Sequence, residues 1–234
     1  MSAGARVVVV TGAAGNLGRA VAGRFLAQGD RLVLVDLQRD SLDAAFGAEQ
    51  PGTLHVAADL LQQPEAQRVA EAALQRFGRI DVLCNLAGGF RMGEAVHDTS
   101  DATWDLMFGL NARTTLCMIR AVVPHLITGG GGKVVNVGAF SAQRGVAAMA
   151  AYTASKAVVM RLTEAMSAEL RGKDINVNCV LPTTLDTPEN RHAMPRADPA
   201  TWVAPDDLAQ VIAFLASDAA RAVHGAALPV TGLA

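Results

Sequence analysis

The sequence has few aromatic residues, charged residues and cysteines, and each shortage excludes a class of protein. Of its 234 residues 4% are aromatic and 18% charged, and the net charge of −2 includes no basic block. Nucleic acid is therefore not expected as a main partner. No uninterrupted apolar run approaches the roughly 20 residues of a membrane span, so no membrane is expected. Cys84, Cys117 and Cys179 lie in apolar contexts without metal-ligand spacing, which predicts reduced thiols, a cytoplasmic protein and no metal site.

Small aliphatic residues dominate in place of aromatics and charges. Hydrophobic residues make up 51% of the chain, so the core is expected to consist of Ala, Val and Leu. Such a composition suits a parallel sheet that helices cover on both faces. The length fits a single domain, which we predict over residues 1–234.

Apolar strand-like runs alternate with helix-like segments along the whole chain. Strands are expected at 6–10, 31–35, 53–58, 80–86, 133–137, 175–181 and 226–230, with helices at 16–28, 62–77, 101–127, 150–170 and 206–216. This alternation predicts an α/β fold, a Rossmann-type doubly wound sheet of about seven parallel strands with right-handed crossovers. Ligands bind such sheets at the carboxyl ends of the strands, where Gly12, Asp36, Asn85, Gly138 and Pro182 fall.

A glycine-rich turn joins the first expected strand to the first expected helix. It reads Thr11-Gly12-Ala13-Ala14-Gly15-Asn16-Leu17-Gly18. A turn of this kind lets the backbone approach a pyrophosphate at the helix N-terminus. Asp36, at the end of the next strand, can accept both ribose hydroxyls and would repel a 2′-phosphate, which predicts NAD(H). Arg39 is the one nearby residue that could permit NADP.

Tyr152 and Lys156 are four residues apart and share one face of an expected helix. The ammonium group would stabilise the phenolate and lower the pKa of Tyr152 toward the working pH, giving a usable acid or base. The pair alone is weak support for catalysis, because the same spacing occurs on solvated helices.

Together these motifs resemble the short-chain dehydrogenase/reductase family over essentially the whole chain. The family's Tyr-x-x-x-Lys motif matches Tyr152 and Lys156, and its helix Asn matches Asn111. The resemblance implies that Tyr152 is the acid/base, that Lys156 holds the nicotinamide ribose, and that Asn111 anchors a water in a proton relay. It also implies cofactor contacts from Gly12, Gly15, Asn16, Leu17, Gly18, Asp36, Asp59, Leu60, Asn85, Ala87, Gly88, Tyr152, Lys156, Pro182, Leu185 and Thr187.

The chain departs from the family pattern at three places. Asn16 stands at the middle glycine of the usual motif, with Gly15 one position earlier, and Thr183 follows Pro182 where Gly is common. Most important, Ala139 stands where the family has its catalytic Ser, 13 positions before the Tyr. Ser141 lies two residues further, about 6–7 Å along a strand, so it could substitute only if this loop is rearranged.

Within the family, these departures resemble the dihydropteridine reductases. The shared features are the shifted glycine, the Gly138-Ala139 pair, the Ala-Gly-Gly-aromatic segment that ends at Phe90, and the segment from Leu181 to Trp202. They predict NADH-dependent reduction of an electrophilic C=N or quinonoid substrate, such as a quinonoid dihydropterin. The predicted substrate pocket contains Ala139, Ser141, Phe90 and Met194, with a substrate loop at about 183–203.

Two other functions remain open from the sequence. One is a general NADH-dependent reductase of ketones or quinones that uses Ser141, and the other is an NAD(H)-sensing binding protein that has lost catalysis. The helices around Asn111 and Tyr152 are apolar on more than one face. By resemblance to the family, those helices predict a homodimer or a homotetramer.

Overall fold

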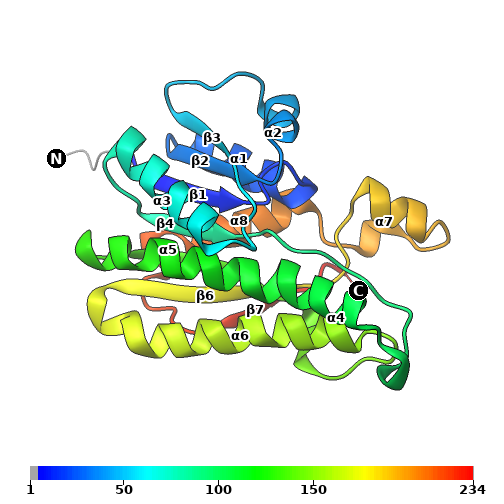
Figure 1. Ribbon diagram of the computed structural model, residues 1–234. Helices are drawn as coiled ribbons and strands as arrows, with labels where there is room; N and C mark the ends of the chain where they lie inside the picture. Colours follow the sequence, from blue (N-terminus) through cyan, green and yellow to red (C-terminus); the bar gives the residue numbers. More distant parts are fainter. Residues whose placement is uncertain (1–4, 234) are drawn as a thin grey trace.

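The computed structural model describes residues 5–233, and its centre is a sheet of parallel strands (Figure 1). The strands are β1 (Val7–Thr11), β2 (Arg31–Asp36), β3 (Thr53–Ala57), β4 (Val82–Asn85), β5 (Gly132–Val137), β6 (Ile175–Pro182) and β7 (Ala227–Val230). They lie in the order β3-β2-β1-β4-β5-β6-β7, so the predicted doubly wound sheet of about seven strands is confirmed. The predicted single domain also includes residues 1–4 and 234, which lie outside the described residues.

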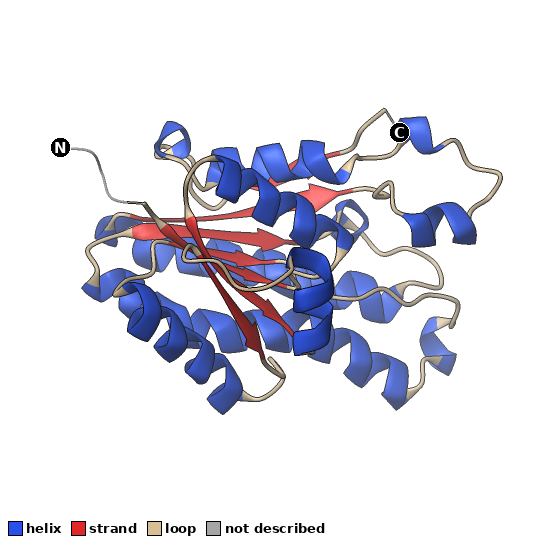
Figure 2. Ribbon diagram, turned by 90° about the horizontal axis from the view of Figure 1, so that it is seen from above, coloured by secondary structure: helices blue, strands red, loops and turns tan. Residues whose placement is uncertain are grey.

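Helices cover both faces of this sheet (Figure 2). One core joins the sheet to α1 (Asn16–Ala27) and α8 (Pro205–Leu215), and the other joins it to α3 (Gln63–Phe77), α5 (Thr114–Thr128) and α6 (Ala150–Leu170). Strand β1 shows the principle, since Val8 and Val10 pack in the first core whereas Val7 and Val9 pack in the second. Successive side chains of a strand point to opposite faces, so a run of four valines serves two cores.

The strand order reverses next to β1. The chain leaves β1 for β2 and β3 on one side, and then returns to place β4 on the other side of β1. Crevices at such reversal points, outside the carboxyl ends of the strands, are where doubly wound sheets bind ligands. This topology therefore puts the glycine turn after β1 beside the segment after β4.

The helix predicted at 101–127 is not a regular α-helix. It consists of α4 (Asp101–Met107), a π-helical turn at Phe108–Arg113, and α5. The hydroxyls of Thr114 and Thr115 donate to the carbonyl oxygens of Leu110 and Asn111, at 2.6 and 2.8 Å. These bonds satisfy carbonyl groups in the π-helical turn. The hydrophobic periodicity of the sequence did not reveal this turn.

The same helical stretch, Asp101–Thr128, is long and apolar enough to cross a membrane by length and composition. This qualifies the expectation that no segment could span one. Its best window has a mean hydropathy of 1.3, and 56% of that window is buried inside the protein. Met118 and Val122 of α5 lie in the core beneath the sheet, and a core helix meets the same criterion.

The predicted substrate loop at 183–203 contains helical structure. Helix α7 (Pro188–Ala193) begins after Thr187, whose hydroxyl accepts a hydrogen bond from the Asn190 N–H. A β-bridge between Leu185 and Val203 closes the base of the segment. Figure 1 shows α7 projecting beyond the strand ends. Helix α2 (Arg39–Phe46) is a second helix that the sequence analysis did not predict.

Candidate active site

A cavity of about 750 Å³ opens at the carboxyl ends of the strands near the reversal point. Its wall includes most of the predicted cofactor residues: Gly12, Gly15, Asn16, Leu17, Gly18, Asp36, Asp59, Leu60, Ala87, Gly88, Leu185 and Thr187. They come from five separate parts of the chain and meet only in the fold. The wall also contains residues that the sequence analysis missed, among them Arg19, Ser41 and Leu110.

The glycine turn brings the backbone of β1 close to the start of α1. Gly12 has a φ of +62°, and a Cβ on Gly18 would lie 2.2 Å from the Gly12 carbonyl oxygen, so neither position accepts a side chain without a shift. Gly15 caps α1 without a side-chain hydrogen bond. The first N–H groups of α1 thus remain available to an anion, and the turn fits the pyrophosphate of a dinucleotide.

The carboxylate of Asp36 is fixed at the end of β2. Its oxygens accept hydrogen bonds from the backbone N–H of Ala14, at 3.0 Å, and of Leu37, at 2.8 Å. Asp36 also lines the cavity. Its carboxylate keeps acceptor positions for the hydroxyl groups of an adenosine ribose. Together with the glycine turn, this geometry fits a nicotinamide dinucleotide.

Thr11 connects β1 to the segment after β4. Its hydroxyl oxygen accepts hydrogen bonds from the N–H groups of Leu86 and Ala87, both at 3.0 Å. Thr11 was not among the predicted site residues, although its place immediately before the first glycine of the turn could have indicated a role there.

Four of the predicted cofactor contacts are not on the cavity wall: Asn85, Tyr152, Lys156 and Pro182. Asn85 is buried, and its amide donates to Asn136 Oδ1 at 2.8 Å, while the Asn136 amide donates to Thr163 Oγ1 at 2.9 Å. This polar chain ties β4 and β5 to α6. Asn136 interrupts an otherwise apolar strand, and that pattern could have indicated a buried partner for Asn85.

The side chain of Asn111 holds the segment after β4 against α6. Its Oδ1 accepts from the Gly89 N–H at 2.9 Å, and its Nδ2 donates to Gly89 O at 3.1 Å and to Ser155 Oγ at 3.0 Å. A Cβ on Gly88 would lie 2.7 Å from Asn111 Oδ1, so this close approach requires glycine. Both N–H donors of the amide are thus used by protein atoms, whereas Oδ1 keeps one acceptor position. The water-anchoring role expected for Asn111 stays a prediction.

Burial governs the protonation of both Tyr152 and Lys156. It raises the pKa of the Tyr152 phenol to about 12 and lowers the pKa of the Lys156 ammonium to about 8. Lys156 Nζ donates to the carbonyl oxygen of Val137 at 2.8 Å. The expectation that Lys156 lowers the pKa of Tyr152 was therefore wrong for this structure. At neutral pH the phenol is a proton donor and the lysine is mostly cationic.

Apolar side chains surround the Tyr152 ring. Ala139 is 3% exposed and belongs to a small buried cluster against which Tyr152 packs. Phe90 lies in the segment after β4, and its ring packs edge to face against the Tyr152 ring at a centroid distance of 4.8 Å. These contacts bring two predicted pocket residues to the predicted catalytic residue.

The other two predicted pocket residues lie in less buried positions. Ser141 is half-buried in a 3-10 helix, Phe140–Gln143, and not on a strand. The rise of a 3-10 helix is about 2.0 Å per residue, so the sequence-based spacing of Ala139 and Ser141 was too long. Met194 is 38% exposed after the end of α7.

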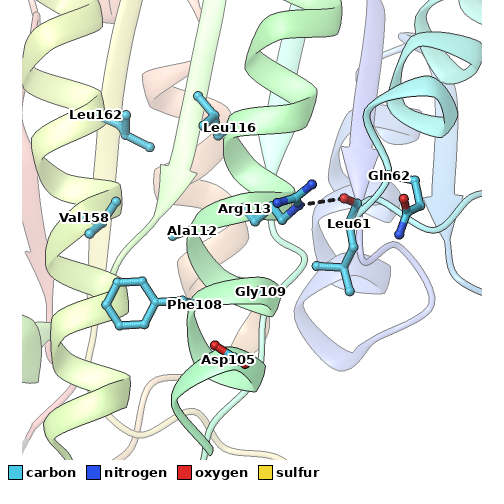
Figure 3. Close-up of a pocket in the computed structure, with 10 residues that line it drawn as sticks. All are labelled: Leu61, Gln62, Asp105, Phe108, Gly109, Ala112, Arg113, Leu116, Val158 and Leu162. Carbon is cyan, nitrogen blue, oxygen red and sulfur yellow. Dashed lines mark hydrogen bonds between the residues drawn. The ribbon is translucent and has the colours of Figure 1, made fainter. Parts of the chain in front are cut away.

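A second cavity of about 650 Å³ lies on the outer face of α4, α5 and α6 (Figure 3). Phe108 and Leu116 line it from one side, and Val158 and Leu162 line it from α6. Arg113 Nε donates to the Leu61 carbonyl oxygen at 2.8 Å across its rim. It contains none of the predicted catalytic residues. No group of three or more His, Cys, Asp or Glu residues within 5–233 could hold a metal ion.

Comparisons with known proteins agree with this geometry. The family model described as short chain dehydrogenase matches residues 6–197. D-threitol dehydrogenase of Mycolicibacterium smegmatis is 33% identical over 97% of this chain and 92% of its own length. 2-(R)-hydroxypropyl-CoM dehydrogenase of Xanthobacter autotrophicus is 32% identical, and the match covers 97% of both chains.

A solved structure extends the likeness to three dimensions. The 3-ketoacyl-(acyl-carrier-protein) reductase of Brucella melitensis, complexed with NADH, superimposes with a TM-score of 0.87. It is 30% identical, and the match covers 97% of each chain. These relatives have different substrates, and none of the three is named as a pterin reductase. On its sequence, its sheet and its cofactor-shaped crevice, this chain belongs to the short-chain dehydrogenase family and is an oxidoreductase.

Proposed function

We propose that this oxidoreductase uses NADH to reduce an electrophilic C=N or quinonoid substrate, of which a quinonoid dihydropterin is the leading example. The observation that carries the proposal is Ala139, a buried methyl group against Tyr152 where the family has a serine hydroxyl. In carbonyl reduction that hydroxyl helps to hold the substrate oxygen as negative charge develops, and losing such a donor costs about 10²–10³ in rate. An activated C=N or quinonoid system depends less on it.

The protonation of Tyr152 supports reduction. Transfer of hydride to the substrate leaves negative charge on its oxygen or nitrogen, and that atom takes a proton from the donor. A phenol with a pKa of about 12 stays protonated at neutral pH and can be this donor. When bound, the nicotinamide supplies the hydride. The residues proposed to hold it are the glycine turn, Asp36, Lys156 and the Ala87-Gly88 segment.

The choice of NADH rests on Asp36. Its carboxylate is held toward the cavity by two backbone N–H groups, where it can accept ribose hydroxyls and would repel a 2′-phosphate. The NADH in the Brucella relative is consistent with this choice.

Phe90 supports a flat substrate, because its ring lies beside the Tyr152 ring and is 57% exposed. Aromatic rings contribute to binding by stacking against such substrates.

A general NADH-dependent reductase of ketones or quinones is the second candidate. The 3-10 helix brings Ser141 closer to Ala139 than a strand would, so its hydroxyl could take the place of the missing one. The named relatives, which include alcohol dehydrogenases and a ketoacyl reductase, also favour this candidate.

Steady-state oxidation of NADH distinguishes these candidates. Chemically generated quinonoid dihydropterin would be compared with a panel of ketones and quinones, using the wild-type protein, Tyr152→Phe and Ser141→Ala. We expect pterin turnover that is lost in Tyr152→Phe and kept in Ser141→Ala. Turnover of a ketone that disappears in Ser141→Ala would support the second candidate. Tight NADH binding without turnover of any acceptor would favour the cofactor-sensing function.

We also propose that the protein assembles as a homodimer or homotetramer through the outer face of α4, α5 and α6. The apolar cavity in Figure 3 supports this surface, since Leu116 is 40% exposed there beside Val158 and Leu162. Sedimentation of the wild-type protein and of Leu116→Glu would test it.

The proposed location is the cytoplasm. The three cysteines support it, because they are buried and form no disulfide.

A further inference from the structure

Arg39 begins α2, three residues after the Asp36 carboxylate. In dinucleotide-binding folds a cation near this position can accommodate the 2′-phosphate of NADP. Whether Arg39 does so depends on where its guanidinium points and on what already binds it.

Every nitrogen of the Arg39 guanidinium is engaged within the protein. Nε lies 2.9 and 3.1 Å from the two carboxylate oxygens of Asp43, Nη2 lies 2.9 Å from Glu49 Oε1, and Nη1 donates to the His55 carbonyl oxygen at 3.2 Å. A guanidinium presents its donors in a fixed fork. Three of its five N–H donors are used here, and the Nε–Nη2 edge that would bind a phosphate in a bidentate manner is turned toward two carboxylates. The side chain is 46% exposed, so these contacts, and not burial, hold it in place.

The acceptors are themselves fixed by β3. Asp43 Oδ1 lies 2.9 Å from His55 Nδ1, and Glu49 accepts a hydrogen bond from the His55 N–H at 3.1 Å. The His55 ring is buried beside Phe46. Arg39 and Asp43 in α2, Glu49 in the following loop and His55 in β3 thus form one connected network.

The register of the sheet shows which way the network pulls Arg39. Asp36 pairs with Ala57 on β3, whereas the His55 carbonyl that binds Arg39 lies two residues earlier. Two residues of a strand span about 6–7 Å. The guanidinium is therefore held about two residues along β3 from the position opposite Asp36, away from the sheet edge where the cofactor ribose is proposed to bind.

We propose that Asp43, Glu49 and the His55 carbonyl lock Arg39 away from the cofactor's 2′ position, and that this lock, together with Asp36, determines selectivity for NAD(H) over NADP(H). The inference rests on the proposed cofactor site. It adds two specificity-determining acidic residues outside the cavity wall. It also makes Arg39 a latent ligand for a 2′-phosphate.

Direct cofactor binding tests the lock without depending on turnover. The dissociation constants of NADH and NADPH would be measured from the fluorescence of the reduced nicotinamide. In Asp36→Asn the repulsion is removed but Arg39 stays locked. In the triple variant Asp36→Asn/Asp43→Ala/Glu49→Ala, Arg39 keeps only the His55 carbonyl as a partner, and we expect NADPH to bind about tenfold tighter than in Asp36→Asn, since a charge-assisted bond to phosphate forms. Adding Arg39→Gln should abolish that gain.

The proposal is overturned if the triple variant gains nothing over Asp36→Asn, or if the gain persists without Arg39. A single substitution, Arg39→Gln, tests the proposal even if the triple variant is poorly folded. Arg39→Gln in the wild-type protein should leave NADPH affinity within twofold, and a larger loss would mean that Arg39 already binds the phosphate. Wild-type protein that binds neither nucleotide would instead refute the cofactor site itself, whereas NADH binding without any response to the lock refutes only this inference.

Discussion

The rings of Phe90 and Tyr152 meet edge to face, at a centroid distance of 4.8 Å and an interplanar angle of 86°. The two residues come from different parts of the fold, one from the segment after β4 and the other from the first turn of α6. Asn111 joins these parts, because its amide binds both Gly89 and Ser155. The aromatic pair is therefore positioned by a buried hydrogen-bond network and not by its own contact alone.

Replacing Phe90 with Ala should weaken binding of the substrate more than binding of the cofactor. An aromatic pair contributes about 0.5–1.5 kcal/mol beyond its burial, which corresponds to a rise in KM of about two- to tenfold if the substrate uses the ring. The dissociation constant of NADH should stay within twofold. Phe90→Leu, which keeps apolar volume without the ring, serves as the matched control. Equal KM values for Phe90→Ala and the wild-type protein would show that the substrate does not contact this ring.

The sequence was sufficient to predict the sheet and the glycine turn, because these depend on local patterns, whereas most of the other wall residues were predicted by resemblance to the family. Runs such as that of β1 form strands wherever both faces are buried, and a glycine turn after β1 needs no distant partner to be recognised. The polar chain from Asn85 through Asn136 depends on contacts between residues 51 positions apart, which no local pattern displays. The pKa of Tyr152 was mispredicted for a similar reason. Its value follows from burial by Phe90 and the Ala139 cluster and not from the nearby Lys156.

Ala139→Ser should restore ketone reduction selectively. A hydroxyl at this position would lie in the cluster against which Tyr152 packs, where it could donate a hydrogen bond to the substrate oxygen. The kcat/KM for ketones should therefore rise by about 10–10², whereas kcat/KM for quinonoid substrates should change little. Ala142→Ser places the same hydroxyl in the same buried cluster one helical turn later and is the matched control. The measurement is NADH oxidation with a ketone and a quinonoid acceptor in parallel. A rise of equal size for both acceptors would contradict the reasoning from Ala139.

The pH dependence of activity should follow Lys156. Its pKa is lowered to about 8 by burial, so it loses its charge as the pH rises past that value, whereas Tyr152, with a pKa of about 12, stays protonated. We expect kcat/KM for reduction to be level below pH 8 and to fall above it, and Lys156→Arg to move the fall to higher pH. A profile that stays level to pH 10 would exclude the charged lysine from the reaction.

Stability should show the opposite trend for the same residue. The folded-state pKa of Lys156 lies below the ordinary value of 10.5, so the buried charge disfavours folding below pH 8 and this cost is relieved as the pH rises toward 10.5. Lys156→Met should thus be more stable than the wild-type protein at pH 7, with the difference shrinking at pH 10. Urea titration at both values checks this. It also separates a loss of activity above pH 8 from unfolding.

Asn111→Ala should destabilise the fold. The side chain is 1% exposed, and its removal leaves the N–H and O of the half-buried Gly89 without their partners. An unpaired polar group that is fully buried costs about 1–3 kcal/mol, and water can reach these two groups in part, so we expect a total of about 2 kcal/mol. Ser155→Ala removes one bond of the network and should cost about 1 kcal/mol. Unfolding midpoints in urea measure both, and similar values for the two variants would argue against a stabilising role for the bonds between Asn111 and Gly89.

Asn16→Gly should loosen α7. Asn16 stands where the family has glycine, and its amide donates to Glu189 Oε2 on α7 at 2.8 Å while its Oδ1 accepts from Arg19. This is a direct tie between the start of α1 and the substrate segment. Without it, the segment should open more often, so limited proteolysis within residues 183–203 should be faster and the substrate KM about threefold higher, by loss of one exposed charge-assisted bond.

Glu189→Gln is the informative partner for that variant. A glutamine keeps an oxygen that accepts from the Asn16 amide, so cleavage should stay close to the wild-type rate if the hydrogen bond holds α7. If instead Glu189→Gln is cleaved as fast as Asn16→Gly, the charge of the carboxylate and its attraction to Arg19 hold the segment. If neither variant differs from the wild-type protein, α7 is held by its base, through the Leu185–Val203 bridge, and the tie at Asn16 has no part in positioning it.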